Sequence, residues 1–142
     1  MLVAQILKDK GDQVFTCAPQ DSLADAARAL NDRAVGAVVV LDGEGVAGIL
    51  SERDVVRAVA ADGPDALTRR VADYMTADVI FASPSESVDE LLGRMTDRRI
   101  RHLPVVHEAR LTGIVSIGDL VKSKIAETVH EAETLKAYIV AG

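Results

Sequence analysis

The sequence predicts an α/β (α+β) fold built by internal duplication, and three observations lead to this prediction. Residues 14–22 align with residues 79–87, and residues 48–56 align with residues 113–121, at a common offset of about 65 positions. Each copy alternates short apolar runs with stretches of helical periodicity. Aromatic residues make up only 3% of the chain, so the core must consist of Val, Leu, Ile and Ala. We therefore predict two similar repeats packed as one module.

A short strand is expected to open each repeat. It covers residues 14–16 in the first copy and 79–81 in the second, and a proline follows it in both cases. A lead-in segment precedes each strand, because residues 3–7 resemble residues 71–75. The predicted element order within a repeat is strand, helix, strand, strand, helix.

A helix is predicted after each proline. Ser87 and Glu90 form a capping-box pattern, in which the hydroxyl and the carboxylate satisfy amides of the first turn. One apolar stripe follows at helical spacing in each copy. Its members are Val88, Leu91, Leu92 and Met95 after Ser87, and Leu23, Ala26, Ala27 and Leu30 after Ser22.

Two adjacent strands and a second helix complete each repeat. The strands are residues 38–41 and 46–50 in the first copy and residues 103–106 and 111–115 in the second. The first strand of each pair is continuously apolar, which is typical of a buried strand. Asp54 and Asp119 then stand at the start of the second helix.

The chain is divided by a predicted linker at residues 63–65, which contain Gly and Pro. We assign residues 1–64 to the first repeat and residues 65–142 to the second. The last helix is expected to run past Glu131 towards Tyr138. Ile125, Val129, Ala132 and Leu135 share one side of it. An apolar helix face at the surface favours packing against a second subunit, so we expect a homodimer.

Composition excludes several classes of function. A net charge of −6 and the near absence of aromatic residues disfavour nucleic acid as a partner. The longest apolar run, residues 34–41, is far shorter than the roughly 20 residues that span a bilayer, so no membrane partner is expected. Cys17 is the only cysteine and requires no oxidising compartment. We therefore expect a cytoplasmic protein.

Motifs of enzymes and metal sites are poorly matched. Residues 43–48 fit the letters G-x-G-x-x-G, but a strand follows them where a dinucleotide site requires a helix. No histidine or cysteine has the paired spacing of zinc ligands. Ser51 and Ser116 lack the G-x-S-x-G context of a hydrolase nucleophile. We therefore predict no catalytic residues and no metal.

One motif occurs at equivalent places in both copies. Ser51 and Asp54, like Ser116 and Asp119, follow a Gly-Ile pair at the end of a strand. Helix capping alone accounts for a Ser and an Asp at such a place. An ionised Asp also suits the two adjacent hydroxyls of a ribose, and a Ser hydroxyl beside helix amides suits a phosphate. The residues alone leave both interpretations open.

Cations accompany the second copy of this motif. Arg98, Arg99, Arg101 and His102 directly precede the buried strand. Basic residues at a helix end also favour the helix dipole, so some of them have this role alone. Arg53 is a further candidate phosphate ligand in the first copy.

These residues resemble a cystathionine-β-synthase (CBS) domain pair, the Bateman module. The resemblance rests on the two G-I-x-S-x-x-D motifs, on residues 101–106 (Arg-His-Leu-Pro-Val-Val) and on Met75-Thr76 before the second repeat. It covers nearly the whole chain, which therefore looks like a stand-alone pair. The family implies two units related by pseudo-twofold symmetry, with clefts between them that bind AMP, ADP, ATP, NAD(H) or S-adenosylmethionine. It also implies disc-like homodimers.

The resemblance assigns a role to residues of both repeats. In the second repeat, it implies that Asp119 binds the ribose and that Ser116 binds a phosphate or ribose oxygen. It also implies that the phosphate is bound by Arg99, Arg101 and His102. The adenine would be surrounded by Val79, Ile80 and Phe81, with Leu103 and Pro104 as an apolar wall. In the first, it implies Thr16, Cys17, Gly36, Ala37, Ser51, Arg53 and Asp54. Gly36-Ala37 stands where the second repeat has Arg101-His102, so the two sites are not equivalent.

The predicted function is that of a regulatory adenine-nucleotide sensor rather than an enzyme. AMP is the first expectation for the ligand, with ATP, ADP or NAD(H) as the others. Ligand binding would be passed to an effector protein through a conformational change. The alternative is a constitutive homodimeric scaffold with vestigial sites.

Overall fold

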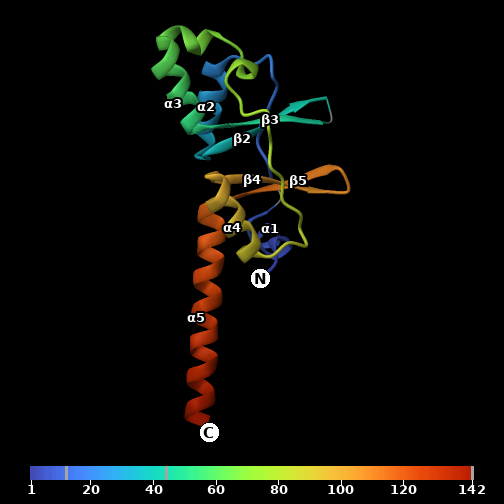
Figure 1. The fold of residues 1–142 in the computed structure, drawn as a ribbon, viewed down its shortest axis with the longest axis vertical. Helices are drawn as coiled ribbons and strands as arrows, with labels where there is room; N and C mark the ends of the chain where they lie inside the picture. The colour runs from blue at the N-terminus through green and yellow to red at the C-terminus, as the bar shows by residue number, and fades with distance from the viewer. Residues whose placement is uncertain (12, 44, 142) are drawn as a thin grey trace. The chain divides into compact units, whose positions relative to one another are not determined.

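The computed structural model describes residues 1–11, 13–43 and 45–141. The chain forms two compact units, named here only for their place along the sequence. The inner unit is Gln13–Ile80, and the outer unit is Met1–Asp12 with Phe81–Gly142. Each unit holds one β-hairpin with helices beside it (Figure 1). The units therefore differ from the sequence halves 1–64 and 65–142, because the segment before each repeat packs in the unit of the other repeat.

The inner unit follows the predicted element order. Its elements are β1 (Thr16–Cys17), α2 (Leu23–Arg33), β2 (Ala37–Asp42), β3 (Gly45–Ser51) and α3 (Glu52–Asp62). β1 runs parallel to β2, and β2 is antiparallel to β3. The apolar stripe of α2 buries Leu23 and Leu30 in a core that includes Val38, Val40 and Leu50. The helices and the hairpin confirm the prediction, and the first strand lies slightly later than residues 14–16.

The outer unit contains α1 (Val3–Lys10), α4 (Val88–Arg98), β4 (His102–His107), β5 (Arg110–Ser116) and α5 (Ile117–Ala141). β4 and β5 pair antiparallel. The predicted strand at residues 79–81 is wrong, because the Val79 N–H donates to the carbonyl of Ala77 in a tight turn. Ala82 alone pairs, in a parallel bridge with Val105. The long last helix is confirmed and continues to Ala141.

Strand register repeats the duplication in three dimensions. Ala37 pairs with Ser51 in the inner unit, and His102 pairs with Ser116 in the outer unit. Both hairpins also shift register at the equivalent point of their strands. The serine that follows each Gly-Ile pair therefore ends its hairpin in the same position.

The predicted linker at residues 63–65 is instead the start of a 3₁₀ helix, η1 (Gly63–Thr68). Pro64 fits the first turn because the missing N–H has no partner there in any case. Ala66 in η1 is fully buried and belongs to the core of the inner unit. A second short 3₁₀ helix, η2 (Val71–Asp73), follows.

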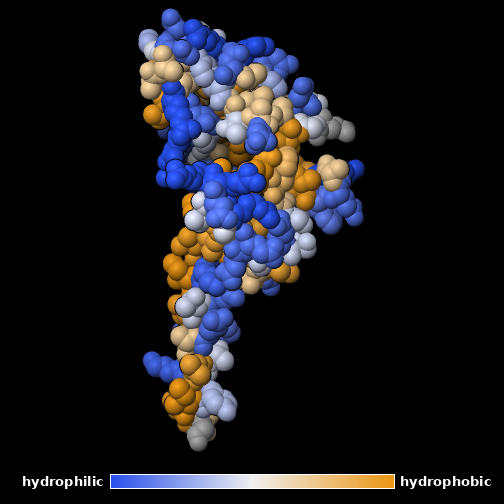
Figure 2. Space-filling model, in the orientation of Figure 1, coloured by the Kyte–Doolittle hydropathy of each residue, from blue (hydrophilic) through white to orange (hydrophobic). Residues whose placement is uncertain are grey.

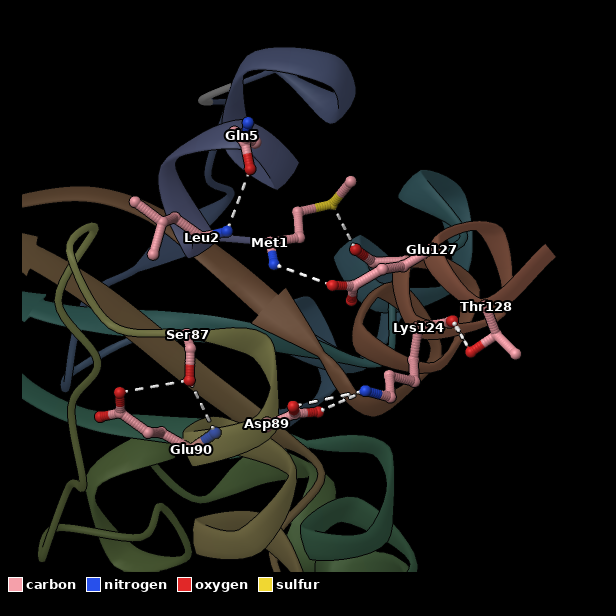
Figure 3. Close-up of polar contacts among 10 residues, drawn as sticks. Met1, Leu2, Gln5, Ser87, Asp89, Glu90, Lys124, Glu127 and Thr128 are labelled. Atoms are coloured by element: carbon pink, nitrogen blue, oxygen red, sulfur yellow. Dashed lines mark hydrogen bonds and ion pairs between the residues drawn. The ribbon is translucent and has the colours of Figure 1, made fainter. Parts of the chain in front are cut away.

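The Ser87 cap at α4 differs in detail from a capping box. The Glu90 N–H donates to Ser87 Oγ at 3.1 Å, as predicted. The Glu90 carboxylate, however, accepts from the Ser87 hydroxyl at 3.2 Å (Figure 3). The N-terminal segment pairs with the residues on either side of Ser87, because the Val3 N–H donates to the Glu86 carbonyl and the Val88 N–H donates to the Met1 carbonyl. A local motif cannot predict this pairing, because Met1 and Val3 are distant from Ser87 in the sequence.

Each lead-in segment packs against one glycine. A Cβ at Gly48 on β3 would lie 2.7 Å from the carbonyl oxygen of Thr76 and 2.8 Å from Sδ of Met75. A Cβ at Gly113 on β5 would lie 2.6 Å from Cδ2 of Leu7. Leu7 and Met75 end the two similar lead-in segments. Each lead-in therefore lies on the Gly-Ile strand of the other repeat, which explains why both strands require glycine.

No helix within the described residues is long and apolar enough to cross a membrane. The same residues hold no group of three or more His, Cys, Asp or Glu side chains arranged to bind a metal ion.

Candidate functional site

Reciprocal hydrogen bonds join Ser116 and Asp119 where β5 passes into α5. The Ser116 N–H donates to Asp119 Oδ2 at 2.9 Å, and the Asp119 N–H donates to Ser116 Oγ at 3.1 Å. These bonds form a capping box, with Asp119 at the third residue of the helix. The box fixes the carboxylate beside the helix N-terminus, where the dipole favours negative charge.

Asp119 has a second partner from a distant part of the chain. Lys10, the last residue of α1, donates from Nζ to Asp119 Oδ2 at 2.5 Å and to the carbonyl of Ile114 at 2.9 Å. The side chains of Lys10 and Asp119 are 33% and 26% exposed, so the pair is only partly screened by water.

The carboxyl of Asp119 is held in its ionised form. Partial burial raises its pKa, but hydrogen bonds from Lys10 and from the Ser116 backbone lower it by more, so the net pKa lies below the usual value. Both bonds end on Oδ2, so neither of them uses Oδ1. Oδ1 can therefore accept from a hydroxyl group of a ligand.

The first repeat has the same capping box without the lysine. The Ser51 N–H donates to Asp54 Oδ2 at 2.9 Å, and the Asp54 N–H donates to Ser51 Oγ at 3.2 Å. Within the described part of the chain, Asp54 makes no ion pair. Arg53 is exposed on the first turn of α3.

A backbone bond connects each box to the residue before the first hairpin strand. The Ile117 N–H donates to the carbonyl of Arg101 at 2.8 Å, and the Glu52 N–H donates to the carbonyl of Gly36 at 2.9 Å. In the outer unit, Arg101 and His102 thus stand beside Ser116 and the N-terminus of α5. In the inner unit, Gly36 and Ala37 take these places beside Ser51 and contribute no charge.

The other predicted residues occupy more varied positions. Arg99 is exposed and ends α4 in the left-handed conformation, with φ of 55°. Leu103 and Pro104 are buried in β4. Phe81 is 40% exposed, and its carbonyl accepts from Arg94. Val79 and Ile80 belong to the inner unit, and Thr16 and Cys17 form β1, beside Val39 and Val40 of β2.

Lys10 is the site residue that sequence reasoning missed. The similarity of residues 3–7 to residues 71–75 locates the lead-in, but it ends before Lys10. A basic residue at the end of a short helix normally indicates only a favourable interaction with the helix dipole. Its partner becomes visible only when α1 is known to pack with β5 and α5.

Cys17 provides a test of the environment of β1. Burial, and secondarily the nearby carboxylate of Asp21, raise the pKa of the Cys17 thiol to about 11. Compared with an ordinary thiol, the fraction of reactive thiolate at neutral pH falls by about 100-fold. We expect iodoacetamide to modify Cys17 in the native protein far more slowly than in the urea-unfolded chain, as measured by mass spectrometry. Equal rates would show that the thiol is not desolvated.

Comparisons with known proteins agree with this architecture. The sequence profile of the CBS domain matches residues 3–61 and 71–125. The mitochondrial CBS domain-containing protein CBSX3 of Arabidopsis thaliana is 34% identical over 149 residues, which cover 99% of this chain and 72% of that protein. The CBS-domain containing protein ATU1752 from Agrobacterium tumefaciens is 42% identical, with a TM-score of 0.85 over 87% of this chain and 99% of that chain.

A further solved structure contains ligands. The CBS domain pair of protein MJ0100, in complex with 5′-methylthioadenosine and S-adenosyl-L-methionine, superposes with a TM-score of 0.80 at 26% identity, over 89% of this chain and 98% of that chain. The repeated hairpins, the matching profile and the structural similarity lead to one conclusion. This chain belongs to the CBS domain family and carries two CBS domains.

Proposed function

We propose that the chain is a cytoplasmic regulatory protein that binds an adenine nucleotide at the capping boxes of its repeats and signals to an effector protein. The observation that carries the proposal is the carboxylate of Asp119, which is ionised, fixed by Ser116, and bonded to Lys10 and the Ser116 backbone through Oδ2. An ionised carboxylate in this state suits the hydroxyls of a ribose. The bound adenosine compounds of the MJ0100 domain pair support the ligand class.

The second repeat is proposed as the stronger site. Arg99 and Arg101 are exposed cations near the start of β4, whereas the first repeat has Gly36 and Ala37 in place of Arg101 and His102. A phosphorylated ligand gains more binding free energy from the cationic side chains of the second repeat. AMP is therefore our first expectation, before ADP, ATP and NAD(H). We propose binding without turnover, because Ser51 and Ser116 lack the sequence context of a hydrolase nucleophile.

The test is a calorimetric titration of the protein with AMP, ADP, ATP, NAD⁺, NADH and S-adenosylmethionine. We expect Asp119→Ala to weaken the binding of the preferred nucleotide by about 30-fold, because it removes a charged acceptor worth about 2 kcal/mol. Asp54→Ala is the matched control, since it loses an equivalent helix cap in the other repeat. It should change this affinity much less.

The outcomes separate the candidate functions. No heat with any ligand, from folded protein, would contradict nucleotide binding and favour a scaffold. Equal losses in Asp54→Ala and Asp119→Ala would contradict the stronger second site. Conversion of ATP or NADH during the titration would contradict a role in binding alone.

A homodimeric scaffold is the second candidate, and α5 favours it. The helix carries Val121, Ile125, Thr128, Ala132, Leu135 and Ile139 at alternating spacings of four and three residues. This is the heptad pattern of a coiled coil, and its large apolar members are all exposed. Figure 2 shows apolar side chains along the part of α5 that extends beyond the rest of the outer unit.

Charge favours a second copy of this chain as the partner of α5. In a parallel pair, Glu131 at one flanking position of the heptad would face Lys136 of the partner copy, and the reverse contact forms by symmetry. We therefore propose a homodimer through α5. A dimer is compatible with either function.

A further inference from the structure

The ammonium group of Lys10 occupies the acceptor that a ribose would need. A ribose presents two adjacent hydroxyls, and a carboxylate binds both most effectively with both oxygens. Asp119 Oδ2 already accepts from Lys10 as well as from the Ser116 backbone, and neither of these bonds uses Oδ1. A ligand hydroxyl and Lys10 therefore compete for the same atom.

The lysine is not required by the capping box itself. Asp54 forms the same box with Ser51 at nearly the same distances, and within the described residues it has no cationic partner. The surrounding contacts differ accordingly. The carbonyl of Ile49 accepts a backbone N–H from Thr76, whereas the equivalent carbonyl of Ile114 accepts from Lys10 Nζ. Lys10 is thus a feature added to the second repeat only.

The Lys10 side chain can leave Asp119 without release of α1. Val3, Ile6 and Leu7 bury one side of this helix. Its N-terminal end is held by backbone bonds from Val3 to Glu86 and from Val88 to Met1. The Met1 ammonium also lies 3.4 Å from Glu127 (Figure 3). With the helix anchored in this way, only the flexible stem of Lys10 needs to move.

We propose that Lys10 determines ligand specificity at the Asp119 site. When a ribose binds, it displaces the ammonium from Oδ2, and the ammonium then pairs with an anionic group of the ligand. The site therefore selects phosphorylated adenosine compounds over neutral adenosine, which offers the ammonium no anionic group. It also selects them over S-adenosylmethionine, whose carboxylate is accompanied by a sulfonium and an ammonium that repel the displaced cation. This inference rests on the proposed function and names its ligand class.

The test compares AMP, adenosine and S-adenosylmethionine in calorimetric titrations of the wild type, Lys10→Met, Lys10→Arg and Lys8→Met. Methionine keeps an apolar stem and removes the charge. We expect the ratio of AMP to adenosine affinity to fall at least about tenfold in Lys10→Met, because AMP loses a cation and adenosine loses a competitor. Lys10→Arg should retain the preference. Lys8→Met, an exposed lysine of the same helix, should leave the ratio unchanged.

Two different failures can be distinguished. If the wild type binds AMP but Lys10→Met keeps its preference over adenosine, Lys10 is only a structural partner of Asp119 and the specificity role is overturned. If the wild type binds none of the three compounds, the proposed function and the role of Lys10 both fail. Thermal melting of each variant shows whether a loss of binding reflects a loss of folded protein.

Discussion

Replacing Gly48 with alanine is expected to lower the free energy of unfolding by about 3 kcal/mol, the upper part of the range for overpacking a core. The added Cβ would lie 2.7 Å from the Thr76 carbonyl oxygen and 2.8 Å from Met75 Sδ. The first of these atoms belongs to the backbone and is held by paired hydrogen bonds between Thr76 and Ile49, of 2.9 and 3.0 Å. The inner unit therefore cannot relax by rotating one side chain.

Gly93 and Gly113 are matched positions for the same change. Gly93 lies within α4, and a Cβ there meets nothing within 4 Å, so Gly93→Ala should stabilise the protein by about 1 kcal/mol through helix propensity. A Cβ at Gly113 meets the end of the flexible Leu7 side chain, so Gly113→Ala should cost less than Gly48→Ala. Urea titrations followed by circular dichroism measure all three. If Gly48→Ala and Gly93→Ala shifted stability equally, the close approach at Gly48 would be refuted.

Sequence patterns predicted those parts of the fold that neighbouring residues determine. Ser22, Ser51 and Ser87 cap helices because their hydroxyls reach amides three residues ahead. The two hairpins follow from apolar runs with a turn between them. The failed strand at residues 79–81 shows the limit of this approach. Its composition suits a strand, but the Val79 N–H, which strand pairing would need, instead donates to the Ala77 carbonyl in a local turn.

Only part of the candidate site could be predicted from the sequence, because sequence patterns indicate local contacts and not distant ones. Ser116 and Asp119 lie three residues apart, and repetition of the motif identified them. Lys10 lies 109 residues from Asp119 and reaches it only because the lead-in of one repeat packs on the other. Periodicity describes the face of an element and does not identify the element that covers it. The exchange of lead-ins was therefore beyond prediction from one sequence.

The second large effect is expected at α5, where Ile125→Glu together with Leu135→Glu should weaken self-association by about 1,000-fold, or about 4 kcal/mol. These side chains are 59% and 60% exposed in the single chain and lie in the heptad face. In the proposed parallel pair each would contact its own counterpart, so the substitutions bury two facing carboxylates at position 125 and two more at position 135. Sedimentation equilibrium over a range of protein concentrations measures the dissociation constant directly.

A charge added elsewhere on the same helix should have little effect on association. Val140 is 84% exposed but is not one of the core positions of the proposed coiled coil, so Val140→Glu introduces a carboxylate away from the proposed contact. The double variant should sediment as a monomer at concentrations where Val140→Glu and the wild type remain dimeric.

Nucleotide affinity measured on both variants then separates assembly from ligand binding, because Asp119 lies on the first turn of α5 and the heptad contact begins beyond it. A monomer that binds AMP normally would assign α5 to assembly and the capping box to the ligand. A monomer that no longer binds would instead show that the site depends on the dimer, and a wild type that is already monomeric would rule out the helix pair.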